Sequence, residues 1–330
     1  MTEQKPIFKH TDHVEAWLFD FNAAIEISAN NSGECKKSLE QLFLEESYWK
    51  DALAFTWCLE TYCGASVIAD KLQHTAAENS IGQLELDKNA TPPSLVNRAG
   101  TEVIEAFLTF NTSVARCRGI LRLSPDKGEP AGLRAWTFFT AIDALVGFEE
   151  KTYRNRPTGE SYSRDFRGPN WLDKRIAAAG YTDREPDVLV VGGGQAGLSI
   201  AARLTQLGVD TLIVDRNKRV GDNWRNRYHA LTLHNQLHVN HLPYMPFPPT
   251  WPTYIPKDML ALWFESYAAA MELNFWCDMD VTSASFDDKQ QRWLVELSTV
   301  DGAQRKVSPR HMIMATGVSG IPNLPDIESL

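Results

Sequence analysis

The chain has 330 residues, with 33 Lys and Arg against 42 Asp and Glu, and a formal net charge of −9. This length suits two domains better than one, and the negative charge without a basic run argues against a nucleic-acid-binding surface. The sequence shows no signal-peptide core near its start and no apolar stretch long enough to cross a bilayer. Its five cysteines are irregularly spaced, which is typical of free thiols in a reducing compartment, so we expect a soluble cytoplasmic protein.

The first part of the chain has the pattern of helices followed by long strands. Apolar residues recur at helical spacing over residues 13–29, and residues 36–47 predict a second helix. Text rich in β-branched and aromatic residues then fills 102–124 and 133–146. Helices followed by a sheet predict an α+β domain over residues 1–148.

A charged segment broken by two prolines, residues 149–185, predicts a linker with one short helix. After it, strands and helices alternate. Residues 187–191 predict a buried strand, 196–208 a helix and 210–215 a second strand. A further amphipathic helix is predicted over 256–271, with a proline at its first position, and segments of strand character follow it.

The sequence GGGQAG, residues 192–197, lies between the first of these strands and the helix. Gly192 would permit the tight turn, Gly194 would let the backbone approach a pyrophosphate, and Gly197 would let the helix pack closely on the strand. The N-terminus of the helix would offer amides and a positive dipole to phosphate oxygens. Asp215 ends the second strand, where it would accept hydrogen bonds from ribose hydroxyls. This order of elements predicts a dinucleotide-binding loop.

Further motifs resemble one group of flavoproteins. A predicted β-meander leads into Ala315-Thr316-Gly317, an arrangement similar to the FAD domain of glutathione-reductase-like flavoproteins. The segments VGDNWRNRYHALTLH, LPYMPFPPTWPTYIPKDMLALWFESYA and MATGVSGIPNLP resemble class B flavin-containing monooxygenases, above all the plant indole-3-pyruvate monooxygenase group and its fungal relatives. The resemblance covers residues 186–326. It implies that residues 186–330 form the N-terminal part of a Rossmann-type α/β FAD-binding domain. We expect this domain to be incomplete.

The resemblance assigns cofactor-binding positions one by one. Gly221 and Trp224 match a Gly-Gly-x-Trp segment near the flavin, and Val281 falls at a strand end that contacts adenine. His234 or Asn235 would orient the flavin or the nicotinamide. The cofactor-binding residues expected are Gly192, Gly194, Gln195, Ala196, Gly197, Asp215, Arg216, Gly221, Trp224, His234, Val281, Ala315, Thr316 and Gly317.

The chemistry implied is that of an FAD-dependent monooxygenase, in which NADPH and oxygen serve the oxygenation of a small organic substrate through a peroxyflavin. Because the cofactor carries this chemistry, no protein residue is assigned as catalytic. The sequence contains no second glycine fingerprint for NADPH, and the family's Phe-x-Gly-x-x-x-His motif would come after Leu330. We therefore expect a C-terminally truncated member without its NADPH domain, unable by itself to oxidise NADPH with a flavin.

The first domain leaves two other functions open. Residues 42–72 and 133–145 resemble a ketosteroid-isomerase-like cone, whose mouth opens on an apolar pocket. Asp51, Tyr48 and Trp57 would line that pocket if the domain acts as an isomerase or hydro-lyase. Alternatively, the two aromatic residues belong to the core and the carboxylate to a helix start or turn. The domain would then provide dimerisation or ligand binding beside a vestigial flavin fold.

Two further features of the second domain are a substitution in the Gly-Gly-x-Trp segment and a group of three histidines. Asp222 replaces the second glycine of the Gly-Gly-x-Trp segment, which leaves the local backbone conformation open. His234, His238 and His241 fit no helical ligand spacing and have no neighbouring carboxylate or thiol, so we expect no metal site. The partners expected are a small-molecule substrate and a second copy of the chain through the first domain, with no nucleic acid and no membrane.

Overall fold

The computed structural model describes residues 10–27, 32–125, 132–157, 166–318 and 320. The chain divides into two compact units, Met1–Glu149 and Glu150–Leu330. The segment predicted as a linker starts at this division, and its helix is α4, Trp171–Gly180. Residues 321–326 of the flavoprotein-like segment lie outside the described residues.

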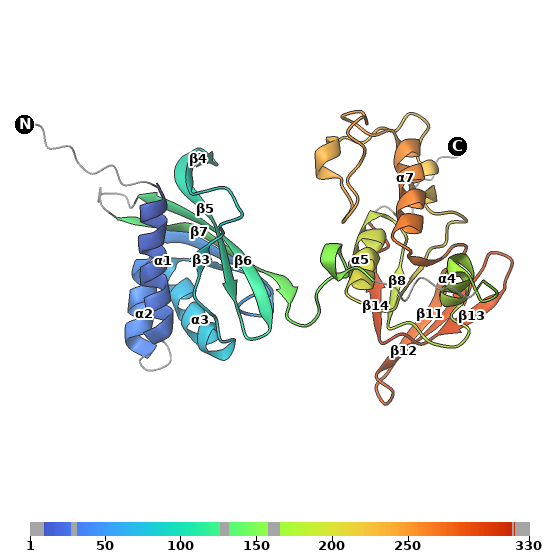
Figure 1. Cartoon of the computed structure of the whole chain (residues 1–330), viewed down its shortest axis with the longest axis horizontal. Coiled ribbons are helices and arrows are strands. Elements are labelled where there is room, and N and C mark those ends of the chain that lie inside the picture. Colours follow the sequence, from blue (N-terminus) through green and yellow to red (C-terminus); the bar gives the residue numbers. More distant parts are fainter. Residues whose placement is uncertain (1–9, 28–31, 126–131, 158–165, 319, 321–330) are drawn as a thin grey trace, which may run out of the picture. The chain divides into compact units, whose positions relative to one another are not determined.

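Three helices lie on one face of the sheet of the first unit (Figure 1). Val14, Trp17 and Phe21 recur at helical spacing and are buried on the sheet side of the first helix, as predicted. Around the ring of Phe138, the rings of Trp17, Phe21, Phe43 and Trp49 lie at centroid distances between 5.7 and 6.4 Å. The helices are α1 (His10–Ile27), α2 (Ser32–Gln41) and α3 (Ala65–Glu78).

The sheet has seven strands in the order β2-β1-β7-β6-β5-β3, with β4 also paired to β5. Neighbours run antiparallel except β1 and β7, which are parallel. The unit has the predicted α+β architecture, but its helices do not all precede the sheet, because α3 lies between β2 and β3 in the chain. The strands are β1 (Phe43–Ala52), β2 (Leu59–Cys63), β3 (Glu85–Leu86), β4 (Ser94–Arg98), β5 (Thr101–Asn111), β6 (Ala115–Pro125) and β7 (Leu133–Leu145).

The second predicted helix, residues 36–47, was too long. Helix α2 ends at Gln41, and the chain continues as β1. In that strand Ser47, Trp49 and Asp51 are buried while the residues between them are exposed. Pairing with β2 and β7 on both sides favours this alternation of period two, which outweighs the helical spacing of the short apolar run.

The second unit combines a parallel sheet with an antiparallel meander. The parallel sheet has the order β10-β9-β8-β14, and the meander the order β11-β12-β13. The predicted alternation is confirmed, although Pro256 is the N-cap of α7 and not its first helical residue. The main elements are β8 (Val188–Val191), α5 (Gln195–Gln206), β9 (Thr211–Val214), α6 (Asp222–Arg225), α7 (Lys257–Ala270), β10 (Asn274–Trp276), β11 (Asp280–Asp287), β12 (Arg292–Ser298), β13 (Gln304–Val307) and β14 (His311–Met314).

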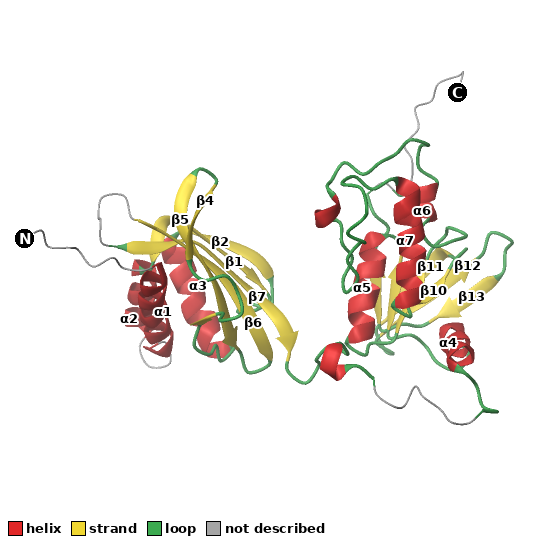
Figure 2. Cartoon of the chain, turned by 45° about the horizontal axis from the view of Figure 1, so that its top comes forward, coloured by secondary structure: helices red, strands yellow, loops and turns green. Residues whose placement is uncertain are grey.

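Alternate side chains of the parallel strands enter two separate cores. Val188 and Val190 of β8 pack with α5 and α7 on one face of the sheet. Leu189, between them, packs with the meander residues Val295 and Leu297 on the other face. The sheet is therefore the middle of three layers, which Figure 2 shows with α5 and α7 apart from the meander.

The segment before β8 is tied to the second unit by polar contacts. The carboxylate of Glu150 accepts hydrogen bonds from Arg203 of α5 at 2.7 Å and from the Tyr244 hydroxyl at 2.5 Å. The indole nitrogen of Trp276 donates to the carbonyl of Ala179 in α4 at 2.7 Å. Glu150 and Ala179 belong to the segment predicted as a linker, yet both contact the rest of the second unit.

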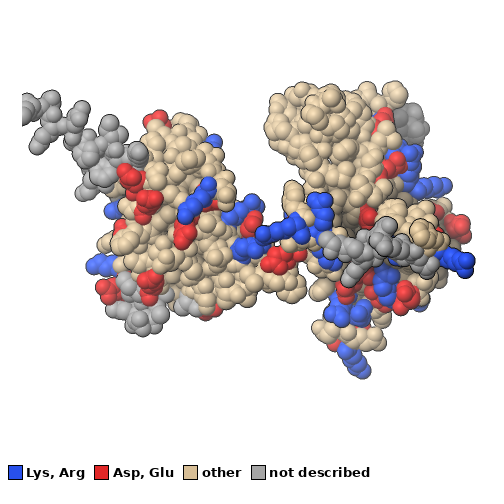
Figure 3. Space-filling model, viewed as in Figure 1, with Lys and Arg blue, Asp and Glu red and all other residues tan. Residues whose placement is uncertain are grey.

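The surface carries both signs of charge. On the face that Figure 3 shows, acidic and basic side chains lie interspersed on each unit.

Among the described residues, no helix is both long enough and apolar enough to cross a membrane.

Candidate dinucleotide site

The glycine loop leaves the parallel sheet where the strand order reverses. The chain passes from β8 to β9 on one side, whereas β14 pairs with β8 on the other. Gly192 follows β8 and Ala315 follows β14, so both loops start at the carboxyl ends of adjacent strands. In open α/β sheets the crevice at such a reversal is the usual place for a ligand.

Two glycines of the loop are required by close packing. Gly192 has a φ of +106°, and a Cβ there would lie 2.5 Å from the carbonyl oxygen of Ala315. A Cβ on Gly197 would lie 1.9 Å from the carbonyl oxygen of Gly192. The tight turn and the close helix packing expected at these positions are therefore both present.

Gly194 differs from these two because its open side faces no backbone. It is the N-cap of α5 in an extended conformation. In the part of the chain that the structure describes, a Cβ there would meet a single neighbour, the side-chain amide of Asn223, at 3.1 Å. Gln195 and Ala196, in the first turn of the helix, are exposed. Their amides have no carbonyl partner within the helix and lie at its positive end, so the arrangement can hold an anion.

Asp215 braces the loop from the end of β9. One carboxylate oxygen accepts a hydrogen bond from the Gly193 amide at 2.6 Å, and the other accepts two from Asn217, each at 2.8 Å. A carboxylate can accept about four hydrogen bonds, so the ribose contact predicted for Asp215 remains compatible with this role. The brace itself was missed by the sequence reasoning, which assigned Asp215 to the ligand alone.

Helix α6 packs directly on α7. Gly221 has a φ of +87°, and a Cβ there would lie 2.4 Å from the carbonyl oxygen of Ala261. Asp222 lies in the first helical turn, with its carboxylate 2.7 Å from the guanidinium of Arg225. No positive φ is needed at Asp222, which explains why this position tolerates a residue other than glycine.

A charged network fastens α6 to α7. Arg225 forms an ion pair with Glu265 of α7 at 2.8 Å, and Arg219 contacts the same carboxylate. The ammonium group of Lys257, which is buried, donates to the Arg225 carbonyl at 2.9 Å. Sequence reasoning did not find this network, because its members are spread over 47 positions and share no motif.

The other residues expected to bind the cofactor differ in their exposure to solvent. His234 and Asn235 are exposed, as are Arg216, Thr316 and Gly317, whereas Val281 is half-buried against the core under the meander. The guanidinium of Arg216 donates to the Gly320 carbonyl. Close contacts join the glycine loop to Asp215 and to Ala315. Within the described residues, no such contact joins His234 or Val281 to them.

Trp224, from the Gly-Gly-x-Trp segment, packs partly buried against the core of α5 and α7. Its indole nitrogen is buried and has no hydrogen-bond partner in the part of the chain that the structure describes. A donor left in this state is costly unless another group accepts from it. Over the same residues, no group of three His, Cys, Asp or Glu side chains could hold a metal ion.

Neither reading of the first unit holds for all three candidate residues, although the expected part of Asp51 in a turn is confirmed. Tyr48 and Trp57 are 45% and 49% exposed and so do not belong to the core. Asp51 is fully buried within β1, not at a helix start, and its carboxylate accepts from the Thr140 hydroxyl at 2.6 Å. It also accepts from the amide and hydroxyl of Thr56, so it braces the turn that follows β1.

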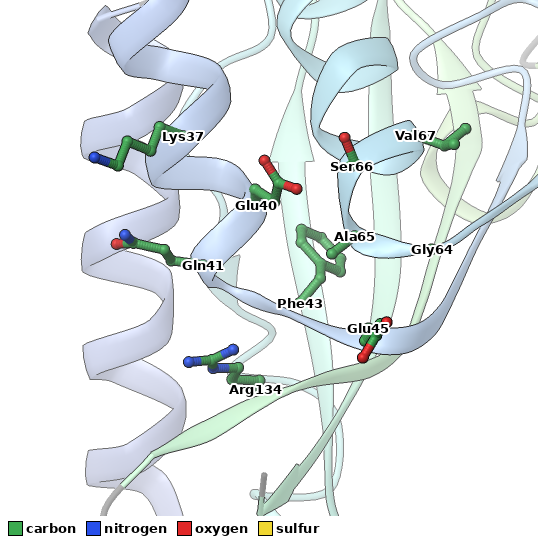
Figure 4. A pocket seen from close by; sticks show the side chains of 10 residues that line it. All are labelled: Lys37, Glu40, Gln41, Phe43, Glu45, Gly64, Ala65, Ser66, Val67 and Arg134. Atoms are coloured by element: carbon green, nitrogen blue, oxygen red, sulfur yellow. The ribbon is translucent and has the colours of Figure 1, made fainter.

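The first unit does contain a cavity of about 600 Å³, at a different place. It lies between the end of α2 and the starts of β1 and α3, where Figure 4 shows Glu40, Phe43 and Ser66 around it. Its other charged lining residues are Lys37, Glu45 and Arg134. None of the three residues predicted to line a pocket takes part in it.

Comparison with known proteins supports the flavoprotein character of the second unit. Residues 190–247 match the family model described as NAD(P)-binding Rossmann-like domain. Indole-3-pyruvate monooxygenase YUCCA1 of Oryza sativa subsp. japonica is 34% identical over 146 residues, which are 44% of this chain and 35% of that protein. Probable indole-3-pyruvate monooxygenase YUCCA4 of Arabidopsis thaliana is 35% identical over 146 residues, 44% of this chain and 34% of that protein.

The chain thus spans about a third of the length of these curated relatives. The predicted resemblance to plant-type flavin monooxygenases is confirmed over about 44% of the chain. Solved structures give partial matches. A flavin-containing monooxygenase from Stenotrophomonas maltophilia is 26% identical over 43% of this chain and 41% of that one, with a TM-score of 0.37. A complex of OTEMO with FAD and NADP is 24% identical over 44% and 28%, with a TM-score of 0.38.

Proposed function

We propose that residues 186–330 bind FAD and belong to an FAD-dependent monooxygenase that uses NADPH and oxygen on a small organic substrate. The observation that carries the proposal is the free N-terminus of α5, placed at the reversal of the sheet and preceded by Gly194, whose open side faces no backbone. The similarity to plant flavin monooxygenases supports the same reading.

The residues present fit the diphosphate and ribose of such a cofactor. The first amides of α5 suit phosphate oxygens, and Asp215 retains room for a ribose hydroxyl. The unpartnered indole nitrogen of Trp224 offers a further donor in the adjoining segment. FAD, when bound, supplies the redox and oxygen chemistry, while the residues of this chain bind it, orient it and exclude water.

For the first unit we propose a scaffold or dimerisation role in a ketosteroid-isomerase-like cone. The helices on one face of a mixed sheet support that fold. The state of Asp51 favours a scaffold over an isomerase or hydro-lyase. Its carboxylate is buried and engaged by Phe55, Thr56 and Thr140, which leaves it no open side toward a substrate.

The test is the visible absorption spectrum of the purified chain after incubation with FAD and desalting. We expect a retained flavin band, because the groups proposed to bind the diphosphate are backbone amides at the N-terminus of α5. The parallel incubation with FMN, which has one phosphate and no adenosine, should leave the protein nearly colourless. A chain that retains no FAD would contradict the proposal, and equal retention of FMN would show that the glycine loop is not what holds the flavin.

A further inference from the structure

Asn223, in the middle of α6, lies against the glycine loop. Its side-chain nitrogen is 3.1 Å from the position that a Cβ on Gly194 would take, and among the described residues it is the one neighbour within 4 Å of that position. No hydrogen bond from this amide to another described residue is found, although the backbone carbonyl of Asn223 accepts from Arg227. A half-buried amide with two donor hydrogens therefore lies beside the open side of Gly194.

Contacts between α6 and α7 fix the position of Asn223. Gly221 seats α6 on the backbone of α7, and the ion pair of Arg225 with Glu265 fixes the end of the short helix. The Lys257 ammonium group adds a hydrogen bond to the Arg225 carbonyl. A side chain on so short a helix would otherwise be poorly placed, because four residues cannot form a stable helix by themselves.

We propose that the Asn223 side-chain amide donates a hydrogen bond to a phosphate oxygen of the bound dinucleotide, opposite the amides of α5. The inference rests on the proposed function, since it assigns a further residue to the same site. A diphosphate that approaches Gly194 would come within reach of the Asn223 nitrogen, which gives up no acceptor among the described residues. A neutral amide suits this position, because a carboxylate there would repel the phosphate.

The first measurement is the dissociation constant of FAD from titration of its fluorescence. Because a hydrogen bond to a charged group is lost, Asn223→Ala should raise this constant about tenfold. Asn226→Ala is the matched control, since Asn226 ends the same helix with an exposed side chain and should leave the constant unchanged. Asn223→Asp should weaken binding further than Asn223→Ala, through repulsion of the phosphate.

Competition with two smaller probes locates the contact. ADP contains the diphosphate without the flavin, and riboflavin contains the flavin without a phosphate. We expect Asn223→Ala to weaken ADP binding by the same factor as FAD binding and to leave riboflavin binding unchanged. Unchanged ADP binding, in a variant whose thermal unfolding matches that of the parent chain, would overturn the inference. In that case retention of FAD by the parent chain would leave the proposed function standing, whereas a parent chain that binds neither FAD nor ADP would overturn both.

Discussion

Glycines of one loop are constrained by different neighbours. Gly197 is packed against the backbone oxygen of Gly192, which cannot move without breaking the turn after β8. Within the described residues, a Cβ on Gly194 would meet only the end of the flexible Asn223 side chain. The sequence pattern treats both as members of one fingerprint, whereas packing separates the glycine that the fold requires from the one that the ligand requires.

We predict that Gly197→Ala lowers the free energy of unfolding by about 3 kcal/mol, because the added methyl group overlaps fixed backbone. Gly194→Ala should change it by less than about 1 kcal/mol, since the Asn223 side chain can turn aside. Urea unfolding followed by circular dichroism measures both. Similar losses in the two variants would contradict this division of roles.

Gly194→Ala should nevertheless weaken FAD binding about tenfold or more, because the methyl group occupies the approach of the diphosphate. Gly132→Ala is a control in the first unit, since no other described residue lies within 4 Å of the Cβ position of Gly132 and its φ is not positive. The dissociation constants of FAD for both variants decide the matter. An unchanged constant in Gly194→Ala would mean that the ligand does not approach this glycine.

The buried carboxylate of Asp51 accepts hydrogen bonds from the turn that follows β1 and so stabilises that turn. We predict that Asp51→Asn lowers the free energy of unfolding by about 2 kcal/mol, because its amide group would point a donor at the donors of Phe55 or Thr56. Glu46→Gln, an exposed change on the same strand, should be nearly neutral. Equal unfolding midpoints in urea for the two variants would contradict the assignment of Asp51 to the turn.

At the scale of elements, Glu105 joins three strands of the first unit. Its nearly buried carboxylate accepts from Arg98 of β4 at 2.6 Å and from Arg122 of β6 at 2.7 Å. The hydrogen bond from Arg98 lowers the pKa of Glu105 below its usual 4.5, desolvation opposes that shift, and Arg122 lowers the pKa further. The ionised carboxylate is therefore favoured more in the folded chain than in the unfolded one.

The contribution of Glu105 to stability is fully present above the unfolded-state pKa near 4.5 and is lost as the pH falls through the lower folded-state pKa. Glu105→Gln should therefore flatten the fall in stability on acidification below about pH 5. Glu102→Gln, exposed on the same strand, should keep the acid sensitivity of the parent chain. Urea midpoints measured across this pH range test the prediction. Equal midpoints for the two variants at every pH would mean that the ion pairs of Glu105 with Arg98 and Arg122 do not contribute to stability.

At the scale of the whole molecule, the second unit begins at Glu150 and so includes the segment predicted as a linker. A fragment that starts at residue 186 would lose the Glu150 contacts to α5 and the α4 carbonyls that accept from Trp276 and Arg305. It would also lose Tyr181, which is buried in the core under the meander, and the apolar side chains that pack on Tyr181 would become exposed to solvent. These losses argue that the segment is needed for stability.

We therefore predict that residues 150–330 unfold at a clearly higher urea concentration than residues 186–330. At about 1 kcal/mol for each lost hydrogen bond, the difference should amount to several kcal/mol. Residues 1–149, with their own core, should unfold independently of either fragment. If the two C-terminal fragments had equal midpoints, the segment would be a linker in the thermodynamic sense after all.

The sequence by itself predicted the glycine loop of the second unit and the strands and helix around it, but not α6 or β10. Strand, turn and helix there follow from local periodicity and from glycines whose roles depend on neighbours a few positions away. Gly192 and Gly197 could be assigned for this reason, and so could the β-meander that leads to Ala315. The α+β order of the first unit came from the same local patterns.

Only the tertiary structure decided which side chains meet across long separations. Asp51 is braced by Thr140, 89 positions away, and that strand pairing also converted the end of a predicted helix into β1. Asn223 reaches Gly194 because α6 is seated on α7, and Glu150 belongs to the second unit because Arg203 and Tyr244 bind it. Such contacts depend on how elements pack, which period and spacing along one chain do not encode.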